Sequence, residues 1–523
     1  MSQGLAGRSF DYVIIGGGPA GCVLAARLSE RSDLSVLLLE AGGPYQRILS
    51  IPLVGMRKIH TLSWKYQTSP QSHLGSRRLA LPFGKLIGGS SSINAMMYVR
   101  GTPAAYDRWA ELGNPGWGFS DLLPYFRKSE RFEDGASAYH GDRGPIYVSH
   151  PRFRAPFSSA FVAACLEIGI PGTDDFNGSA PEGAGFYDVM QNRGVRSAAA
   201  KAYLGPAKHR ANLRIMPHAN VQRILINHGC ATGVEFLDAH GQTQRVSADR
   251  EVILSAGSLN SPKLLMLSGI GPADPLQALG IPCMLDLPGV GANLQDHPRV
   301  PVLYETSQRS PGAKLHWPGA VARYAFNRTG VLASNCCESG ALVRSHAGVP
   351  IPDLQFVTHF QSHQYPGVVD LQFNLAHVHS RGRVSLTSAD PQTAPRIDPN
   401  FLSDPADVLA AIAGIRLARK IAATSRLQAF PLTREILPGA DLQSDAQLHA
   451  YCQSMAETSY HTIGTCSMGT DAMAVVDPNL RVHGLNQLRV VDASVMPELP
   501  NGNTCAPTYM IAEKAADLIL AHT

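Results

Sequence analysis

Three glycines near the start of the chain, Gly16, Gly18 and Gly21, have the spacing G-x-G-x-x-G. Between a strand and a helix, these positions give a tight turn, close backbone approach to a pyrophosphate, and contact between helix and strand. Glu40 stands nineteen residues after Gly21. An acidic side chain there accepts hydrogen bonds from ribose hydroxyls, while the helix amino terminus attracts phosphates. These residues predict a site for a dinucleotide, either FAD or NAD.

The elements around the glycines support this prediction. Residues 12–15 form a short β-branched and aromatic run, which indicates a buried strand. Residues 22–28 are helix formers with small side chains, and a second apolar run, 35–39, ends at Glu40. A strand, a helix and a second strand ending in an acid distinguish this segment from an ordinary glycine turn.

Two later segments predict further units of the same α/β type. Residues 251–254 indicate a strand, and Ser261 followed by Pro262 predicts the start of a helix that continues over 263–268. Residues 488–492 again predict a strand, and 507–520 a helix with one apolar side. The proline-rich loop between them follows the end of a strand, so we expect it to face a ligand.

The middle of the chain, about 301–455, has a different pattern. Segments 353–357 and 370–374 alternate between apolar and polar residues, which predicts strands that are half exposed on one face. We expect a sheet domain that covers the cofactor.

Composition limits the classes of function. A chain of 523 residues with 44% hydrophobic and 16% charged residues predicts a globular protein of two or three domains. The 45 basic residues barely exceed the 41 acidic ones and form no block, so no nucleic-acid partner is expected. Nine cysteines without C-x-x-C spacing argue against a disulfide framework and a zinc site, and no metal is expected.

Location follows from the same composition. Free thiols favour a reducing compartment, and we expect a cytoplasmic protein. The first residues lack an apolar signal core, and no run of eighteen apolar residues occurs, so neither a signal peptide nor a transmembrane segment is predicted. Peripheral contact with a membrane stays open.

Seven blocks, spread in order over nearly the whole chain, carry a family resemblance. They are DYVIIGGGPAGCVLAARLSE with LLLEAGG, GKLIGGSSSINAMMYVRG, VILSAGSLNSPKLLMLSGIGP, LPGVGANLQDHP, SYHTIGTCSMG, VVDPNLRVHGLNQLRVVDASVMP and NGNTCAPTYMIAEKAADLI. The sequence resembles the glucose-methanol-choline (GMC) family of FAD-dependent oxidoreductases, and within it the choline and sorbose dehydrogenase-like branch of alcohol dehydrogenases. The resemblance favours FAD over NAD.

The resemblance implies an α/β fold of two domains. The FAD-binding domain is Rossmann-like, of the glutathione-reductase type, and the substrate domain is built on a six-stranded antiparallel sheet. We expect residues 1–155, 195–300 and 456–523 in the FAD-binding domain, and 156–194 and 301–455 in the substrate-binding domain.

The resemblance also implies which residues hold FAD. The ADP half falls to Gly16, Gly18, Gly21 and Glu40, with the main chain of Val221 at the adenine. The expected contacts to the pyrophosphate and flavin are Gly89, Ser90, Asn94, Asp492, Ala493, Pro507 and Thr508. Some members attach FAD covalently to a histidine after the serines, but Ile93 stands at that position here. We therefore expect non-covalent FAD.

By the same resemblance, His461 in SYHTIGTCSMG is the general base. An alcohol does not ionise near neutral pH, so hydride transfer to the flavin N5 requires a base, and histidine suits that role. Relatives carry a second asparagine or histidine close to the substrate oxygen, at the position that we assign to Cys505. Three alternatives stay open: His461 acts alone, Asn503 or a water supplies the polar contact, or the second position is apolar. We favour His461 acting alone beside an apolar second position.

The substrate is less sharply defined. Glu338 could pair with a cationic substrate such as choline, but a structural role for this acid is favoured. We expect a primary alcohol or hydroxymethyl compound as substrate and a quinone-like acceptor. An oxidase that uses oxygen is the first alternative, and a non-redox lyase or a light-driven decarboxylase on the same scaffold is the second. The sequence does not fix the oligomeric state.

Overall fold

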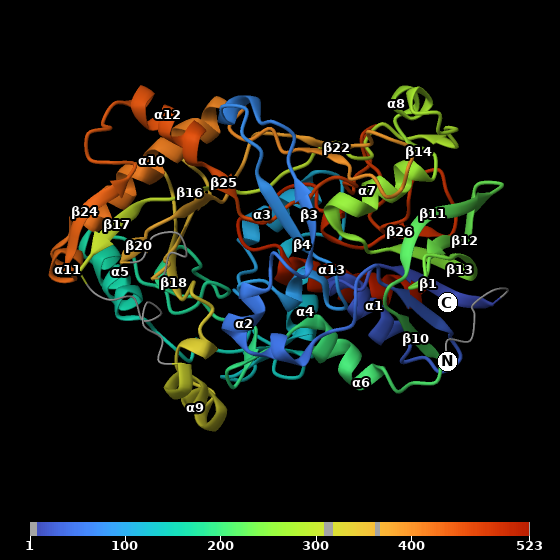
Figure 1. Ribbon diagram of the computed structural model, residues 1–523, viewed down its shortest axis with the longest axis horizontal. Helices are drawn as coiled ribbons and strands as arrows, with labels where there is room; N and C mark the ends of the chain where they lie inside the picture. The colour runs from blue at the N-terminus through green and yellow to red at the C-terminus, as the bar shows by residue number, and fades with distance from the viewer. Residues whose placement is uncertain (1–7, 308–316, 361–366, 522–523) are drawn as a thin grey trace.

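A seven-stranded sheet carries the glycine turn in the computed structural model, which describes residues 8–307, 317–360 and 367–521 (Figure 1). Its strands follow the order β10-β2-β1-β13-β12-β11, and β26 also pairs with β13. They are β1 (Ser9–Ile15), β2 (Val36–Leu39), β10 (Leu213–Met216), β11 (Asn220–Asn227), β12 (Cys230–Leu237), β13 (Thr243–Leu254) and β26 (Leu488–Val490). The strands predicted over 12–15, 35–39, 251–254 and 488–492 are therefore all present.

Five of these strands, β10, β2, β1, β13 and β26, are parallel and end at one edge. Ile15 of β1 is opposite both Leu39 of β2 and Leu254 of β13, and Leu254 is opposite Val490 of β26. The residues that follow these strands therefore meet at this edge, as the carboxyl ends of parallel strands do in ligand-binding α/β sheets.

Helix α1 (Pro19–Leu28) follows the glycine turn, with Pro19 in its first turn. Its small residues are almost all buried, and it packs beside α13 (Cys505–Leu520) in the middle of the molecule (Figure 1). The other helices are α2 (Pro52–Arg57), α3 (Pro103–Glu111), α4 (Phe119–Ser129), α5 (Pro156–Glu167), α6 (Gly205–Ala207), α7 (Gly257–Leu267), α8 (Ala273–Ala278), α9 (Trp317–Asn327), α10 (Pro405–Ala422), α11 (Ser425–Ala429) and α12 (Asp445–Met455).

The predicted six-stranded antiparallel sheet is present, with the order β25-β16-β21-β19-β18-β7. Its strands are β7 (Gly183–Phe186), β16 (Pro298–Val300), β18 (Ser339–Val343), β19 (Leu354–Val357), β21 (Phe373–Leu375) and β25 (Glu457–Thr458). The residue bounds expected for the two domains stay a prediction.

The prediction of half-exposed strands in this sheet was wrong, because every residue of β18, β19 and β21 is buried. One face packs on α5 and α10. The opposite face meets a small apolar cluster that includes Met97, Tyr187 and Val357. The strand expected over 370–374 is also divided: β20 (Val368–Asp370) pairs with β17 (Leu303–Thr306), and only β21 joins the six-stranded sheet.

Helix α7 begins at Gly257, four residues before the predicted start, and Pro262 lies inside it. Proline cannot donate the helical hydrogen bond to the carbonyl of Ser258. The hydroxyl of Thr465 donates to that carbonyl instead, at 2.6 Å. Because a hydroxyl from a distant loop pairs with this carbonyl, the proline is tolerated inside the helix and does not mark its start.

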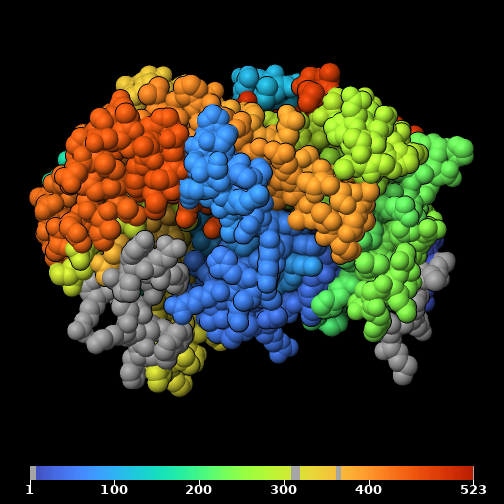
Figure 2. Space-filling model, turned by 45° about the horizontal axis from the view of Figure 1, so that its top comes forward, coloured from blue at the N-terminus to red at the C-terminus, as the bar shows by residue number. Residues whose placement is uncertain are grey.

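An antiparallel pair of strands, β3 (Ser63–Gln67) and β4 (Ala80–Gly84), crosses the middle of the molecule (Figure 1). In Figure 2 the blue segment that contains this pair lies between orange segments of the later chain. None of the helices within the described ranges has both the length and the hydrophobicity needed to cross a bilayer.

Candidate active site

One cavity of about 470 Å³ joins the glycine turn to the loop of His461. This volume is typical of sites for cofactors and small molecules, roughly 300–1,000 Å³. Residues at the ends of β1, β2, β13 and β26 line one part of it, and residues of the six-stranded sheet line another. Because the cavity is continuous, a ligand held at the glycine turn can extend as far as His461.

A different structural feature explains the glycine at each of the three positions of the turn. Gly16 has φ +102°, and a side chain there would meet the carbonyl of Ser255. A β-carbon on Gly21 would lie 1.9 Å from the carbonyl oxygen of Gly16, so Gly21 allows α1 to pack against the turn. Gly18 has φ −74°, a conformation open to any residue, and no protein atom lies within 4 Å of the position of a β-carbon. The space beside Gly18 therefore belongs to the cavity.

Glu40 follows β2 and lines the cavity near this turn. Its two carboxyl oxygens accept hydrogen bonds from the backbone N–H groups of Gly17 (2.8 Å) and Gly42 (2.7 Å). Burial raises the pKa of Glu40 to about 7, although these two donors favour the ionised form. Hydroxyl donors on a ligand would stabilise the carboxylate further.

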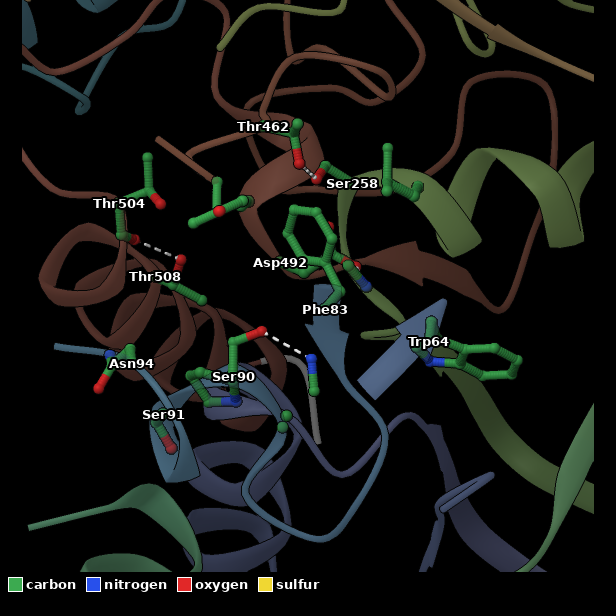
Figure 3. A pocket seen from close by; sticks show the side chains of 18 of the residues that line it. Trp64, Phe83, Ser90, Ser91, Asn94, Ser258, Thr462, Asp492, Thr504 and Thr508 are labelled. Atoms are coloured by element: carbon green, nitrogen blue, oxygen red, sulfur yellow. Dashed lines mark hydrogen bonds between the residues drawn. The ribbon is translucent and has the colours of Figure 1, made fainter. Parts of the chain in front are cut away.

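The other residues expected at FAD come from several elements, and most of them line the same cavity. These are Gly89, Ser90, Asn94, Val221, Asp492, Ala493 and Thr508. Figure 3 shows Ser90, Asn94, Asp492 and Thr508 around one hollow, with the hydroxyl of Ser90 bonded to the backbone of Gly84. Pro507 lies buried in α13 and does not line the cavity.

These residues fit FAD. The amino end of α1 has no side-chain cap, so its N–H groups are open to a phosphate. The space beside Gly18 allows close approach of that phosphate, and Glu40 stands where ribose hydroxyls would meet it. Glu40, the glycine turn and Val221 would hold the ADP half, and Ser90, Asn94 and Ala493 would line the flavin half.

The backbone before His461 directs this side chain into the cavity. Tyr460 has φ +62°, which is uncommon for a residue with a side chain, and it turns the chain sharply just before His461. The buried carboxylate of Asp296 accepts hydrogen bonds from the backbone N–H of His461 (2.8 Å) and from the hydroxyl of Thr458. Asp296 thus fixes the chain on both sides of Tyr460.

Hydrogen bonds at both ring nitrogens fix the state of His461. Asn503 donates from Nδ2 to Nε2 of His461 at 3.1 Å, because Gln355 donates to the amide oxygen of Asn503. Nδ1 of His461 lies 3.0 Å from Nδ1 of His297. Since Nε2 accepts, Nδ1 carries the proton and its N–H donates a hydrogen bond to Nδ1 of His297. Burial lowers the pKa of His461 to about 4, so the ring is neutral near pH 7 with a basic nitrogen at Nε2.

Of the two candidates for the partner of His461, the structure places Asn503 beside the imidazole. Cys505 lines the cavity as the first residue of α13. Burial raises the pKa of Cys505 to about 12, with smaller opposing effects from hydrogen bonds to Tyr509 and Asn94. The thiol is therefore neutral and directed to other partners. Among the three alternatives, this geometry supports Asn503 as the polar contact, and the catalytic roles of Asn503 and Cys505 stay predictions.

Sequence reasoning missed His297 and Gln355. His297 lies in the block LPGVGANLQDHP, which signalled the family but not a contact with His461. Gln355 lies in a strand that was predicted, but the pattern of a single strand does not reveal which loop its side chains reach.

Glu338 has a structural role. Its fully buried carboxylate accepts hydrogen bonds from the backbone N–H of Ala155 and from the hydroxyls of Ser158 and Ser334. It does not line the cavity, so it is not placed to pair with a cationic substrate.

Comparisons with known proteins agree with this architecture. The family models for the N-terminal and C-terminal parts of GMC oxidoreductases match residues 10–299 and 378–512. An alcohol dehydrogenase [acceptor] of Pseudomonas putida is 44% identical, covering 98% of this chain and 96% of that protein. An oxygen-dependent choline dehydrogenase of Paraburkholderia xenovorans is 42% identical, covering 98% and 95%.

The fold is similar to that of solved enzymes. The crystal structure of pyridoxine 4-oxidase from Mesorbium loti matches with a TM-score of 0.90 and 32% identity, covering 98% of this chain and all of that one. A formate oxidase of Aspergillus oryzae matches with a TM-score of 0.91 and 30% identity over 99% of both chains. With two matching family models and relatives that extend over nearly its whole length, this chain belongs to the GMC oxidoreductase family of FAD-dependent enzymes, which oxidise CH–OH groups.

Proposed function

We propose that this protein oxidises a primary alcohol or hydroxymethyl group to the aldehyde, with His461 as the general base. The observation that carries the proposal is the neutral imidazole of His461, which presents a basic Nε2 beside Asn503 in the cavity that reaches the glycine turn. The alternatives without net redox are not favoured, because the relatives named above are dehydrogenases and oxidases.

The residues of the chain act on the hydroxyl group. When substrate binds, its hydroxyl replaces the amide of Asn503 as the donor to Nε2 of His461. Nε2 then accepts the hydroxyl proton, and the amide of Asn503 donates a hydrogen bond to the same oxygen and orients it. Bound FAD would supply the two-electron oxidation by accepting hydride from the carbinol carbon. The proton gained by His461 and the hydride together account for the two hydrogens that the alcohol loses.

Non-covalent FAD is part of the proposal. Ile93 lines the cavity at the position of the histidine that some relatives bond to FAD, and an aliphatic side chain cannot form such a bond. Acid precipitation of the yellow protein is expected to leave FAD in the supernatant. Flavin that stays with the precipitate would contradict this part.

The acceptor that we propose is a quinone-like compound rather than oxygen. The names of the relatives include both dehydrogenases and oxidases, so they do not decide between the two. Mixing the protein with alcohols under nitrogen is expected to bleach the flavin, which tests the reaction itself. Slow recolouring in air and fast recolouring with a quinone would support the dehydrogenase, and fast recolouring in air would identify an oxidase.

The pH dependence follows from the pKa of His461. Because burial lowers this pKa to about 4, the ring is in its basic form at every higher pH. We expect kcat/KM to be level from about pH 6 to 8 and to fall as the pH drops through about 4 to 5, since protonation removes the base. Flavin absorbance at each pH separates this loss from release of FAD. An acid limb centred near pH 6.5 would show that His461 titrates as in water.

Asn503→Ala and Cys505→Ala test which residue is the partner of His461. Removing the hydrogen bond of Asn503 is expected to lower kcat/KM about tenfold, equivalent to roughly 1.4 kcal/mol. Cys505→Ala is expected to change kcat/KM by less than about threefold, because no hydrogen bond joins this thiol to His461. A larger loss with Cys505→Ala than with Asn503→Ala would return the partner role to the cysteine.

A further inference from the structure

We infer that Arg299 gives the substrate end of the cavity a positive wall, so that the enzyme selects uncharged or anionic alcohols and rejects quaternary ammonium alcohols. This inference rests on the proposed function, since it names the substrate class of the same site. Arg299 lines the cavity, and 22% of its side chain is exposed.

The register of the six-stranded sheet places Arg299 near the base. Arg299 on β16 is directly opposite Asn374 on β21, which is opposite Gln355 on β19. Residues directly opposite on neighbouring strands point to the same face of a sheet. Gln355 donates to the amide of Asn503, which in turn contacts His461. This polar row, Arg299, Asn374 and Gln355, thus runs along one face to the reacting group.

The residues that alternate with this polar row identify the face of the sheet that packs on the hydrophobic core. Val300, Phe373 and Phe356 alternate with the polar row and are completely buried in the hydrophobic core. The polar row faces the cavity, because Arg299 and Asn374 are among the lining residues.

A cross-strand ion pair holds Arg299 in place. Glu457 on β25 is opposite Arg299, and its carboxylate bonds the guanidinium. Burial works against the charge of Arg299, but Glu457 and Tyr460 outweigh it and raise its pKa. Glu457 is not a lining residue, so the cavity meets the cationic partner of the pair. A guanidinium offers hydrogen-bond donors only, which suits a carbonyl, hydroxyl, ring oxygen or carboxylate on the substrate.

Within the described ranges, no carboxylate is placed to receive a cation at this end. Among the described residues that line the cavity, the acids are Glu40 and Asp492. Glu40 is bonded to the backbone of the glycine turn, and Asp492 to Gly257, Ser261 and Ser494. Residues 1–7, 308–316, 361–366 and 522–523 contain no aspartate or glutamate in the sequence. Aromatic side chains at the cavity, Trp64 and Tyr460 among them, offer ring faces to a cation, but without a free carboxylate a trimethylammonium group meets the guanidinium of Arg299, a charge of its own sign.

Overall similarity would have suggested the opposite preference. Relatives named oxygen-dependent choline dehydrogenase are 42–44% identical over 98–99% of the chain. The charge facing the cavity, rather than total identity, decides whether a cation is accepted.

The test compares choline with 3,3-dimethylbutan-1-ol, an uncharged alcohol of nearly the same shape. Flavin reduction under nitrogen gives the ratio of their second-order rate constants, and calorimetry on the His461→Ala holoenzyme gives the ratio of their dissociation constants without turnover. We expect both ratios to favour the uncharged alcohol at least tenfold. Arg299→Gln is expected to reduce this preference at least tenfold, because Glu457 then lacks its cationic partner. Arg245→Gln is the matched control, since Arg245 forms a cross-strand ion pair with Glu235 outside the cavity.

Equal or tighter binding of choline by the unmodified site would overturn the inference, as would an unchanged ratio in Arg299→Gln with normal flavin content. Flavin content and melting temperature separate both results from misfolding. Failure of every alcohol to bleach the flavin would instead refute the proposed function, while the binding ratio would still report the charge preference.

Discussion

Replacing His461 by alanine is expected to lower the rate of flavin reduction by an alcohol at least about a hundredfold while FAD stays bound. A positioned base contributes roughly 10²- to 10⁴-fold. The loss should appear in the reduction step, because hydride leaves the carbinol carbon only when the hydroxyl proton passes to Nε2 of His461. Stopped-flow absorbance under nitrogen measures this step, and the flavin spectrum of the purified variant gives its FAD content.

His461→Gln and His483→Ala make this result specific. Glutamine retains hydrogen-bonding groups near the position of Nε2 but is not a base, so it should be nearly as slow as alanine. His483 bonds the backbone of Gly469 and lies outside the cavity, so its loss should leave reduction within about twofold. A near-normal rate in His461→Ala would remove this residue from the role of base.

The basicity of Nε2 depends on groups beyond the cavity wall. His297 is completely buried, and burial lowers its pKa well below the usual value, so its ring stays neutral and accepts a hydrogen bond from Nδ1 of His461. When His461 gains the substrate proton, this acceptor stabilises the imidazolium through Nδ1. Asp296, whose pKa burial raises to about 7, fixes the backbone rather than the ring.

The cofactor half of the site could be predicted from the sequence because its signals are local. Gly16, Gly18 and Gly21 lie within six residues, and the strand that leads to Glu40 follows after a single helix. Helix α7 shows the limit of such signals. Its start depends on a hydroxyl from Thr465, some two hundred residues away, which compensates for Pro262.

The substrate half could not be predicted because it depends on register between distant strands. Arg299, Asn374 and Gln355 meet only through the pairing of β16, β21 and β19. A shift of one residue would turn them to the buried face. The same reason explains the assignment of Cys505: two residues along a loop and helix start point in different directions, and only the fold shows that Asn503 faces His461.

Gly18→Asn is expected to abolish most FAD binding while leaving the fold intact. Gly18 is the N-cap of α1 in an extended conformation, and asparagine is among the best N-cap residues, so the helix should lose no stability. The new side chain would occupy the space beside Gly18 and bond the N–H groups of the first turn. It would then compete with the phosphate for both space and donors. Overpacking of this kind costs roughly 2.7 kcal/mol of binding free energy, so we expect the affinity for FAD to fall about a hundredfold.

Gly205→Asn is the matched control for this variant. Gly205 also has a negative φ, −51°, and no protein atom within 4 Å of a β-carbon, but it begins α6 away from the cofactor cavity. It should bind FAD normally, by flavin absorbance and by titration of the apoprotein. Circular dichroism and the melting temperature of the two apoproteins should agree. The asparagine side chain would occupy the N–H donors at the N-terminus of α1 and leave none for a phosphate. Full flavin content in Gly18→Asn would therefore show that the phosphate does not approach this turn.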